Sequence, residues 1–192
     1  MIINDKYRFI FYHIPKNAGT SVRTFLEKLD GNVAHGIEAA HEEPSVFVKK
    51  LNYLKWGIVR DPWARMESAF KYFLATAHGK RKWGDRPFYE FVEDIADFYS
   101  FPSETVRYFP VFKPQMNWIP HLDVAIRCED LEAGIFSMGQ ELGFQVPNRL
   151  PMMNISQKGR PKWSKRALEV FEDYYGDDIG AMSYTFTGEV DG

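Results

Sequence analysis

The fold is decided by residues 7–29, which read YRFIFYHIPKNAGTSVRTFLEKL. Residues 7–14 form a short apolar run rich in β-forming side chains, and this run predicts a buried strand. A Pro-Lys-Asn-Ala-Gly turn follows it. From Ser21 onward, apolar side chains recur at the spacing of one helix face: Val22, Phe25, Leu26 and Leu29. The stretch therefore predicts a strand, a loop and a helix in succession.

The same order of elements recurs along the chain. A second strand is expected over residues 56–59 and a third over residues 122–127, each followed by a helical apolar stripe. Further helices are expected over residues 88–99 and after Ser164, while residues 78–87 are expected to form a basic loop. Strands that alternate with helices are typical of a parallel sheet covered on both faces. We therefore expect an α/β fold of three αβα layers, in a single domain over residues 1–192 whose tail at 187–192 frays.

Composition excludes several classes of protein. The 192 residues are 45% hydrophobic and 26% charged, with a net charge of -2, so neither a disordered chain nor a nucleic-acid partner is expected. No apolar run is long enough for stable membrane insertion. Asp5, Lys6 and Arg8 interrupt what would be the apolar part of a signal peptide, which favours a cytoplasmic protein. A single cysteine, Cys128, excludes an internal disulfide, and no metal site is expected. The sequence carries no signal for an oligomeric state.

The loop over residues 13–21 is the first candidate site. The first amides of a helix have no internal acceptor and lie at the positive end of the helix dipole, so they bind phosphate or sulfate. Gly19 allows close approach of the backbone, Thr20 and Ser21 add hydroxyl donors, and Lys16 adds a positive charge. The Walker A pattern is absent, because the lysine precedes the glycine. The alternative is a tight turn with an ordinary Ser or Thr N-cap.

The second candidate loop, residues 59–68, also lies where a strand ends and a helix begins. Arg60 stands at the carboxyl end of the strand, where open α/β sheets bind ligands, and its guanidinium suits a phosphate. Arg65 and Ser68 share one helical face and could reach the same anion. The alternative is that Arg60 pairs with Asp61 or a nearby glutamate.

Together these residues resemble a known family. HIPKNAGTS at 13–21 and VRDPWARMESAF at 59–70 look like the two signature loops of the sulfotransferases that use 3'-phosphoadenosine 5'-phosphosulfate (PAPS). The carbohydrate branch, with the heparan and chondroitin enzymes and short bacterial relatives, is the most similar. The resemblance continues through PFYEFV at 87–92, Pro114-Gln115, RCEDL at 127–131 and NIS at 154–156 to the final helix. It implies a P-loop-like nucleotide-binding fold and covers nearly the whole chain.

The resemblance also implies roles for individual residues. The 5'-phosphosulfate of PAPS would lie in the first loop, on Lys16, Asn17, Ala18, Gly19, Thr20 and Ser21. The 3'-phosphate would lie on Arg60 and Ser68. A late loop that closes over the nucleotide in several sulfotransferases is similar to residues 157–160, which adds Lys158, Gly159 and Arg160; the alternative is a solvated loop.

The chemistry needs a base to take the proton from an acceptor hydroxyl, and histidine suits neutral pH. His41 is favoured over His35, and Glu42, Glu43 or another carboxylate is the alternative. Lys16 would neutralise charge on the departing phosphate oxygen.

His13 is expected to be packed, and Cys128 to be an inert buried thiol. The cluster at 80–82 beside Trp83 is either a solvated surface or a contact for an acidic glycan.

The sequence thus predicts a PAPS-dependent sulfotransferase acting by in-line transfer to a hydroxyl of a carbohydrate or small metabolite. Its partners would be the nucleotide donor and that acceptor. Two alternatives stay open. One is a nucleotide kinase of the P-loop type, and the other is a sulfotransferase-like protein that binds the nucleotide without catalysis.

Overall fold

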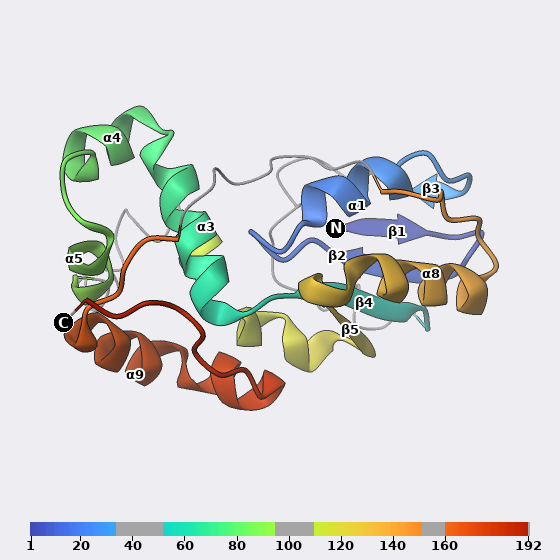
Figure 1. Ribbon diagram of the computed structural model, residues 1–192. Helices are drawn as coiled ribbons and strands as arrows, with labels where there is room; N and C mark the ends of the chain where they lie inside the picture. The colour runs from blue at the N-terminus through green and yellow to red at the C-terminus, as the bar shows by residue number, and fades with distance from the viewer. Residues whose placement is uncertain (34–51, 95–109, 151–159, 192) are drawn as a thin grey trace. The chain divides into compact units, whose positions relative to one another are not determined.

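The computed structural model describes residues 1–33, 52–94, 110–150 and 160–191 (Figure 1). The chain divides into two compact units. The first, here called the sheet unit, comprises Met1–Arg60 and Gln115–Ile155. The second, called the helical unit, comprises Asp61–Pro114 and Ser156–Gly192. Each is described by itself, and one domain over residues 1–192 stays a prediction.

The sheet unit is built on a five-stranded sheet in the order β3-β1-β2-β4-β5. Its strands are β1 (Ile2–Asn4), β2 (Phe9–Tyr12), β3 (Asn32–Val33), β4 (Leu54–Val59) and β5 (Val124–Arg127). β2, β4 and β5 are parallel, while β1 pairs antiparallel with both β2 and β3. The α/β class with a mostly parallel sheet is confirmed. The two antiparallel strands were not predicted, because three and two residues are too few to show an alternating pattern.

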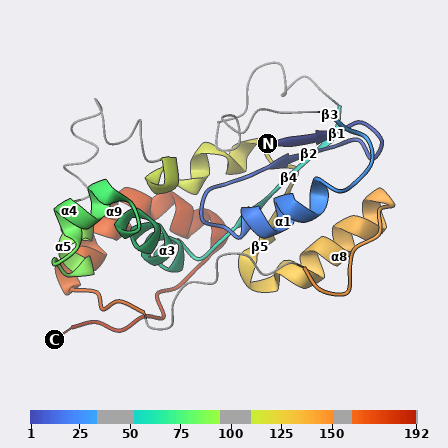
Figure 2. The ribbon, with the colours of Figure 1, turned by 90° about the horizontal axis from the view of Figure 1, so that it is seen from above.

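Two helices, α1 (Gly19–Leu26) and α8 (Leu131–Leu142), lie on one face of this sheet (Figure 2). Their apolar stripes and the strands share one core, which includes Phe9, Phe11, Trp56, Ile58, Ile126, Val22, Leu26, Ile135 and Met138. Successive strand residues point to opposite faces, and Phe9 to Tyr12 are all at most 1% exposed. The sheet is therefore buried on both faces at β2, and the arrangement is consistent with the expected αβα fold. At the β5 edge, Ile126 is buried while Ala125 and Arg127 are exposed.

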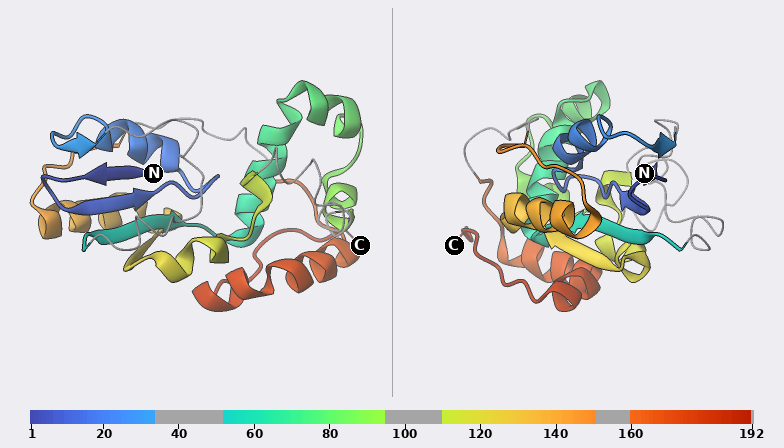
Figure 3. Two further views of the ribbon diagram at one scale, coloured as in Figure 1. Left: turned by 180° about the vertical axis from the view of Figure 1, so that it is seen from behind. Right: turned by 90° about the vertical axis from the view of Figure 1, so that its right-hand side faces the viewer.

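The helical unit contains α3 (Pro62–Leu74), α4 (Ala77–Trp83), α5 (Phe88–Glu93), α9 (Lys165–Met182) and the 3₁₀ turn η2 (Pro110–Phe112). α5 lies against α9 (Figure 3). The core between these helices is aromatic and includes Trp63, Phe70, Phe73, Trp83, Phe91, Trp163 and Phe171. Residues 78–87 were expected to be a loop, but most of them belong to α4. Thr76 caps that helix by accepting from the Gly79 amide at 3.0 Å.

The end of the chain is paired rather than frayed up to residue 191. The Trp163 amide donates to Glu189 O at 3.1 Å, and the Asp191 amide donates to Trp163 O at 2.7 Å. Lys162 and Asp191 add an exposed ion pair at 2.8 Å. Within the described ranges, no helix is both long and apolar enough to cross a membrane.

Candidate functional site

The first loop joins the carboxyl end of β2 to the start of α1. Lys16 and Ala18 both have a left-handed backbone, with φ of 68° and 57°. Such residues cost roughly 1–2 kcal/mol each when they are not glycine, so the surroundings have to hold them in place. Turns that include left-handed residues direct successive amides into a concavity that suits an anion. The conformation of the loop is therefore compatible with the expected phosphate or sulfate site.

α1 begins without a side-chain cap. Its N-cap is Ala18, which has no polar side chain, and the first turn contains no acidic residue. The alternative of an ordinary Ser or Thr N-cap is therefore wrong. The amides of Ser21 and Val22 donate to Ala18 O. Among the residues that the structure describes, the amides of Ala18, Gly19 and Thr20 donate no hydrogen bond, so this helix start keeps donors for an anion.

A buried glutamine links this loop to the end of β4. Gln115 Oε1 accepts from Asn17 Nδ2 at 2.6 Å and from the Arg60 amide at 3.0 Å, and Gln115 Nε2 donates to Arg60 O at 2.9 Å. Asn17 Nδ2 also donates to Ile58 O at 2.7 Å. Asn17 and Gln115 are both 0% exposed. The bridge holds the first loop and Arg60 side by side.

The guanidinium of Arg60 completes this arrangement. Its Nη1 donates to Lys16 O at 3.2 Å, so the side chain turns toward the first loop. Arg60 forms no ion pair within the part of the chain that the structure describes, and Asp61 Oδ1 instead accepts from the Ala64 amide, capping α3. The alternative that Arg60 pairs with Asp61 is thus not supported. Lys16, Asn17, Ala18, Gly19, Thr20, Ser21 and Arg60 come together in one unit.

Comparison with known families decides what kind of protein carries this site. Residues 1–102 match the sulfotransferase family. The chain belongs to this family. Comparison with curated proteins and with solved structures finds no match. The resemblance drawn from the two loops is confirmed, the carbohydrate branch is consistent with it, and sulfo-group transfer in general is supported. Both loops lie within the matched residues.

Three predicted residues of this sulfotransferase lie in the helical unit. Arg65 is 2% exposed, and its Nη2 donates to Lys113 O at 2.8 Å. Ser68 is buried on α3, with 9% of its surface exposed. Arg160 is bound to Glu67, a buried carboxylate on the same helix: Arg160 Nη2 lies 3.1 Å from Glu67 Oε1, and Nε lies 3.2 Å from both oxygens. Trp163 Nε1 also donates to Glu67 Oε1 at 3.2 Å. Glu67 thus balances the charge of Arg160.

The remaining predicted residues of the sulfotransferase lie outside the described residues. These are His35, His41, Glu42, Glu43, Lys158 and Gly159. Within the described ranges, no group of three His, Cys, Asp or Glu side chains could hold a metal ion. Cys128 is half-buried, and burial raises the pKa of its thiol, an effect that the charge of Arg60 opposes. This environment favours the neutral thiol.

Gln115 and Glu67 are the site-forming residues that sequence reasoning missed. Pro114-Gln115 was noted for its resemblance to the family, but nothing in the local sequence indicates that its side chain reaches Asn17. Glu67 reads as an ordinary polar residue of an amphipathic helix. Their partners lie 98 and 93 residues away in the chain, respectively. Only the fold brings each pair together.

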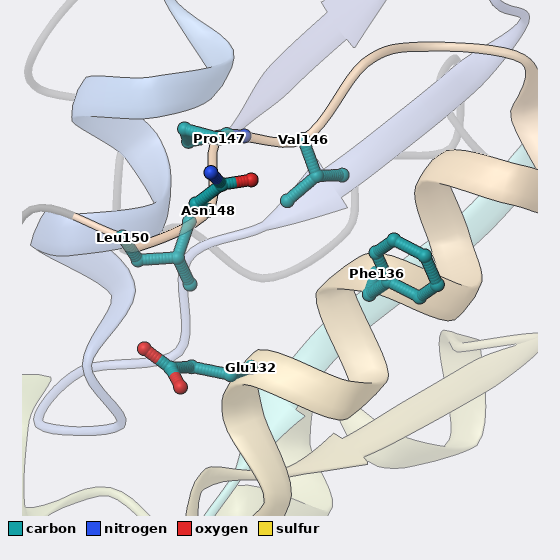
Figure 4. A pocket seen from close by; sticks show the side chains of 6 residues that line it. All are labelled: Glu132, Phe136, Val146, Pro147, Asn148 and Leu150. Carbon is teal, nitrogen blue, oxygen red and sulfur yellow. The ribbon is translucent and has the colours of Figure 1, made fainter.

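The sheet unit also has a surface cavity of about 400 Å³ that contains none of the predicted residues (Figure 4). Glu132 and Phe136 line it from α8, and the other lining residues come from the segment that follows this helix: Val146, Pro147, Asn148 and Leu150. It is distinct from the loop that begins α1.

Proposed function

We propose that this sulfotransferase uses PAPS as its donor and that residues 16–21 and Arg60 bind it. The bridge through Gln115 supports this most directly, because it joins an uncapped helix start to an arginine without an ion-pair partner among the described residues. The donor carries anionic groups at two ends of one nucleoside. Two adjacent anion-binding elements suit such a molecule better than a single phosphate.

The residues present fit the chemistry that PAPS supplies, which is an activated sulfo group with adenosine 3',5'-bisphosphate as the leaving group. The amides of Ala18, Gly19 and Thr20 would receive the sulfo end, and Lys16 would neutralise charge on the phosphate oxygen that departs. Arg60 and Ser68 would bind the 3'-phosphate. Holding donor and acceptor in line then removes much of the barrier, as it does in phosphoryl transfer.

The acceptor supplies the attacking oxygen, and its proton has to leave as the new S–O bond forms. We propose His41 as the base that takes this proton, with His35, Glu42 or Glu43 as alternatives. The acceptor class that we propose is a hydroxyl of a carbohydrate or small metabolite.

Release of adenosine 3',5'-bisphosphate from PAPS in the presence of a panel of hydroxylated sugars and metabolites tests the activity. The wild-type protein should release bisphosphate only with an acceptor. His41→Ala should lose turnover by about a hundredfold or more while it keeps bisphosphate affinity, and His35→Ala should do so if His35 is the base instead. If both variants keep full turnover, histidine is not the base. If no acceptor supports release while bisphosphate still binds, the chain is a nucleotide-binding member of its family without catalysis.

The P-loop kinase alternative has a separate signature. It requires Mg²⁺ and transfer from ATP, and it would leave PAPS unchanged. The lysine of the first loop precedes Gly19 rather than following it, which favours the sulfo donor over ATP.

A further inference from the structure

Gly19 is the first residue of α1, and its backbone conformation does not require glycine. The left-handed glycines among the described residues are Gly31 and Gly143, whereas Gly19 begins a regular helix, where alanine would ordinarily be favoured. Whether another residue could stand here therefore depends on the space around its Cα atom.

That space is filled by the ring of His13. A Cβ atom on Gly19 would lie 2.0 Å from His13 Cδ2, 2.4 Å from Nε2 and 2.9 Å from Cγ. Real Cβ atoms do not approach other atoms so closely, and a ring at the end of β2 has little freedom to move. His13 is 8% exposed, and its ring stacks on Phe11 with ring centroids 6.4 Å apart.

These contacts form a continuous path from the core to the loop. Phe11 belongs to the core of the sheet unit and packs on Trp56, with ring centroids 4.7 Å apart. His13 lies between Phe11 and the start of α1. The loop between them contains both Lys16 and Ala18 in the left-handed conformation. The imidazole ring of His13, at the start of this loop, thus packs against the Cα atom of Gly19, at its end. This contact sets the distance between the two ends of the loop.

We propose that His13 is a positioning residue for the donor loop, and that its imidazole ring is what requires glycine at position 19. The proposal rests on the proposed function, because it concerns how the same loop is held ready for the donor. It gives Gly19 a different role from the one expected from sequence, in which the missing side chain makes room for the anion itself.

The two roles of Gly19, packing on His13 or making room for the anion, can be separated by enlarging residue 19 and shrinking residue 13. We would measure the Kd of adenosine 3',5'-bisphosphate and the KM for PAPS for the wild type, Gly19→Ala, His13→Ala and the double variant. Gly19→Ala should weaken bisphosphate binding by about tenfold or more, because the start of α1 has to move off the ring. Adding His13→Ala to Gly19→Ala should restore at least about threefold of this loss, because a methyl group then replaces the ring. Gly180→Ala is the matched control, since a Cβ there meets nothing within 4 Å.

Two outcomes would overturn the proposal. One is wild-type affinity in Gly19→Ala, and the other is a double variant that binds no more tightly than Gly19→Ala. If Gly19→Ala does not fold, the comparison moves to His13→Ala with and without the second change: the proposal requires that Gly19→Ala be tolerated there. If the wild type binds no bisphosphate, the proposed function fails, and the packing is still tested by the unfolding midpoints of the same four proteins.

Discussion

Gln115 Oε1 accepts a hydrogen bond from Asn17 Nδ2 at 2.6 Å, although the two residues are 98 positions apart in the chain. The same oxygen accepts from the Arg60 amide at 3.0 Å. One buried side chain thus ties the first loop to the end of β4. We infer that this hydrogen-bonded bridge holds the two parts of the candidate donor site, the first loop and Arg60, next to each other.

Replacing Gln115 with methionine should weaken both stability and donor binding. Methionine keeps the approximate length of the side chain but leaves the Arg60 amide and the Arg60 carbonyl without their partner. Each buried group left unpaired costs about 1–3 kcal/mol. Urea unfolding should show this loss, and calorimetry should show weaker binding of adenosine 3',5'-bisphosphate. Gln140→Met on the exposed side of α8 is the control. Unchanged affinity in a destabilised Gln115→Met would show that the bridge is structural only.

Arg60→Lys should lose affinity mainly for the 3'-phosphate. Lysine keeps the charge but not the planar fork that can contact Lys16 O and a phosphate together. We expect about 10- to 100-fold weaker binding of adenosine 3',5'-bisphosphate, with little change for adenosine 5'-phosphate. Arg23→Lys, an exchange on the surface of α1, should leave both ligands unaffected. An equal loss for both nucleotides would assign Arg60 to the other end of the donor.

Breaking the pair between Glu67 and Arg160 should destabilise the helical unit. Glu67 is buried and receives donors from both Arg160 and Trp163, whereas the Arg160 side chain is 44% exposed. Because that exposure screens the pair, we expect Glu67→Gln to cost about 1–3 kcal/mol in urea unfolding, below the range for a fully buried pair. Glu169→Gln removes an exposed ion pair with Arg166 and should cost under about 0.5 kcal/mol. Equal effects of the two changes would contradict this account.

Tyr12 should make stability depend on pH in the alkaline range. Burial, with a smaller effect of Asp123, raises the pKa of Tyr12 from 10.0 to about 12. A raised pKa means that the neutral phenol is favoured in the folded state, so its contribution is complete below pH 10 and is lost as the pH rises toward 12. The free energy of unfolding should fall by about 2–3 kcal/mol more in the wild type than in Tyr12→Phe over this range. Parallel curves for the two proteins would show that Tyr12 titrates normally.

Much of the fold follows from local patterns in the sequence. The strand, loop and helix over residues 9–26 were predictable because apolar spacing and turn residues are contiguous there. The partners of Asn17 and Glu67 were not, because hydrogen bonds across 98 and 93 residues leave no trace in local spacing. Residues 78–87 were predicted to be a loop because α4 is rich in charged residues. Its buried face consists of Gly79 and Trp83, which is too short an apolar pattern to indicate a helix. The packing of His13 on Gly19 could not be read from sequence, because a glycine in a loop is ordinarily explained by its backbone.

Thermal unfolding with adenosine 3',5'-bisphosphate, compared with ATP plus Mg²⁺ and without any acceptor, tests the donor site most directly. A ligand at a hundred times its Kd stabilises the folded chain by about 2.7 kcal/mol, which raises the midpoint by roughly 5–10 °C at this size. The account predicts this rise for the bisphosphate alone, and a smaller rise at the same ligand concentration in Arg60→Lys. A rise with ATP and Mg²⁺ instead, or with neither ligand, would contradict the proposal that residues 16–21 and Arg60 bind PAPS.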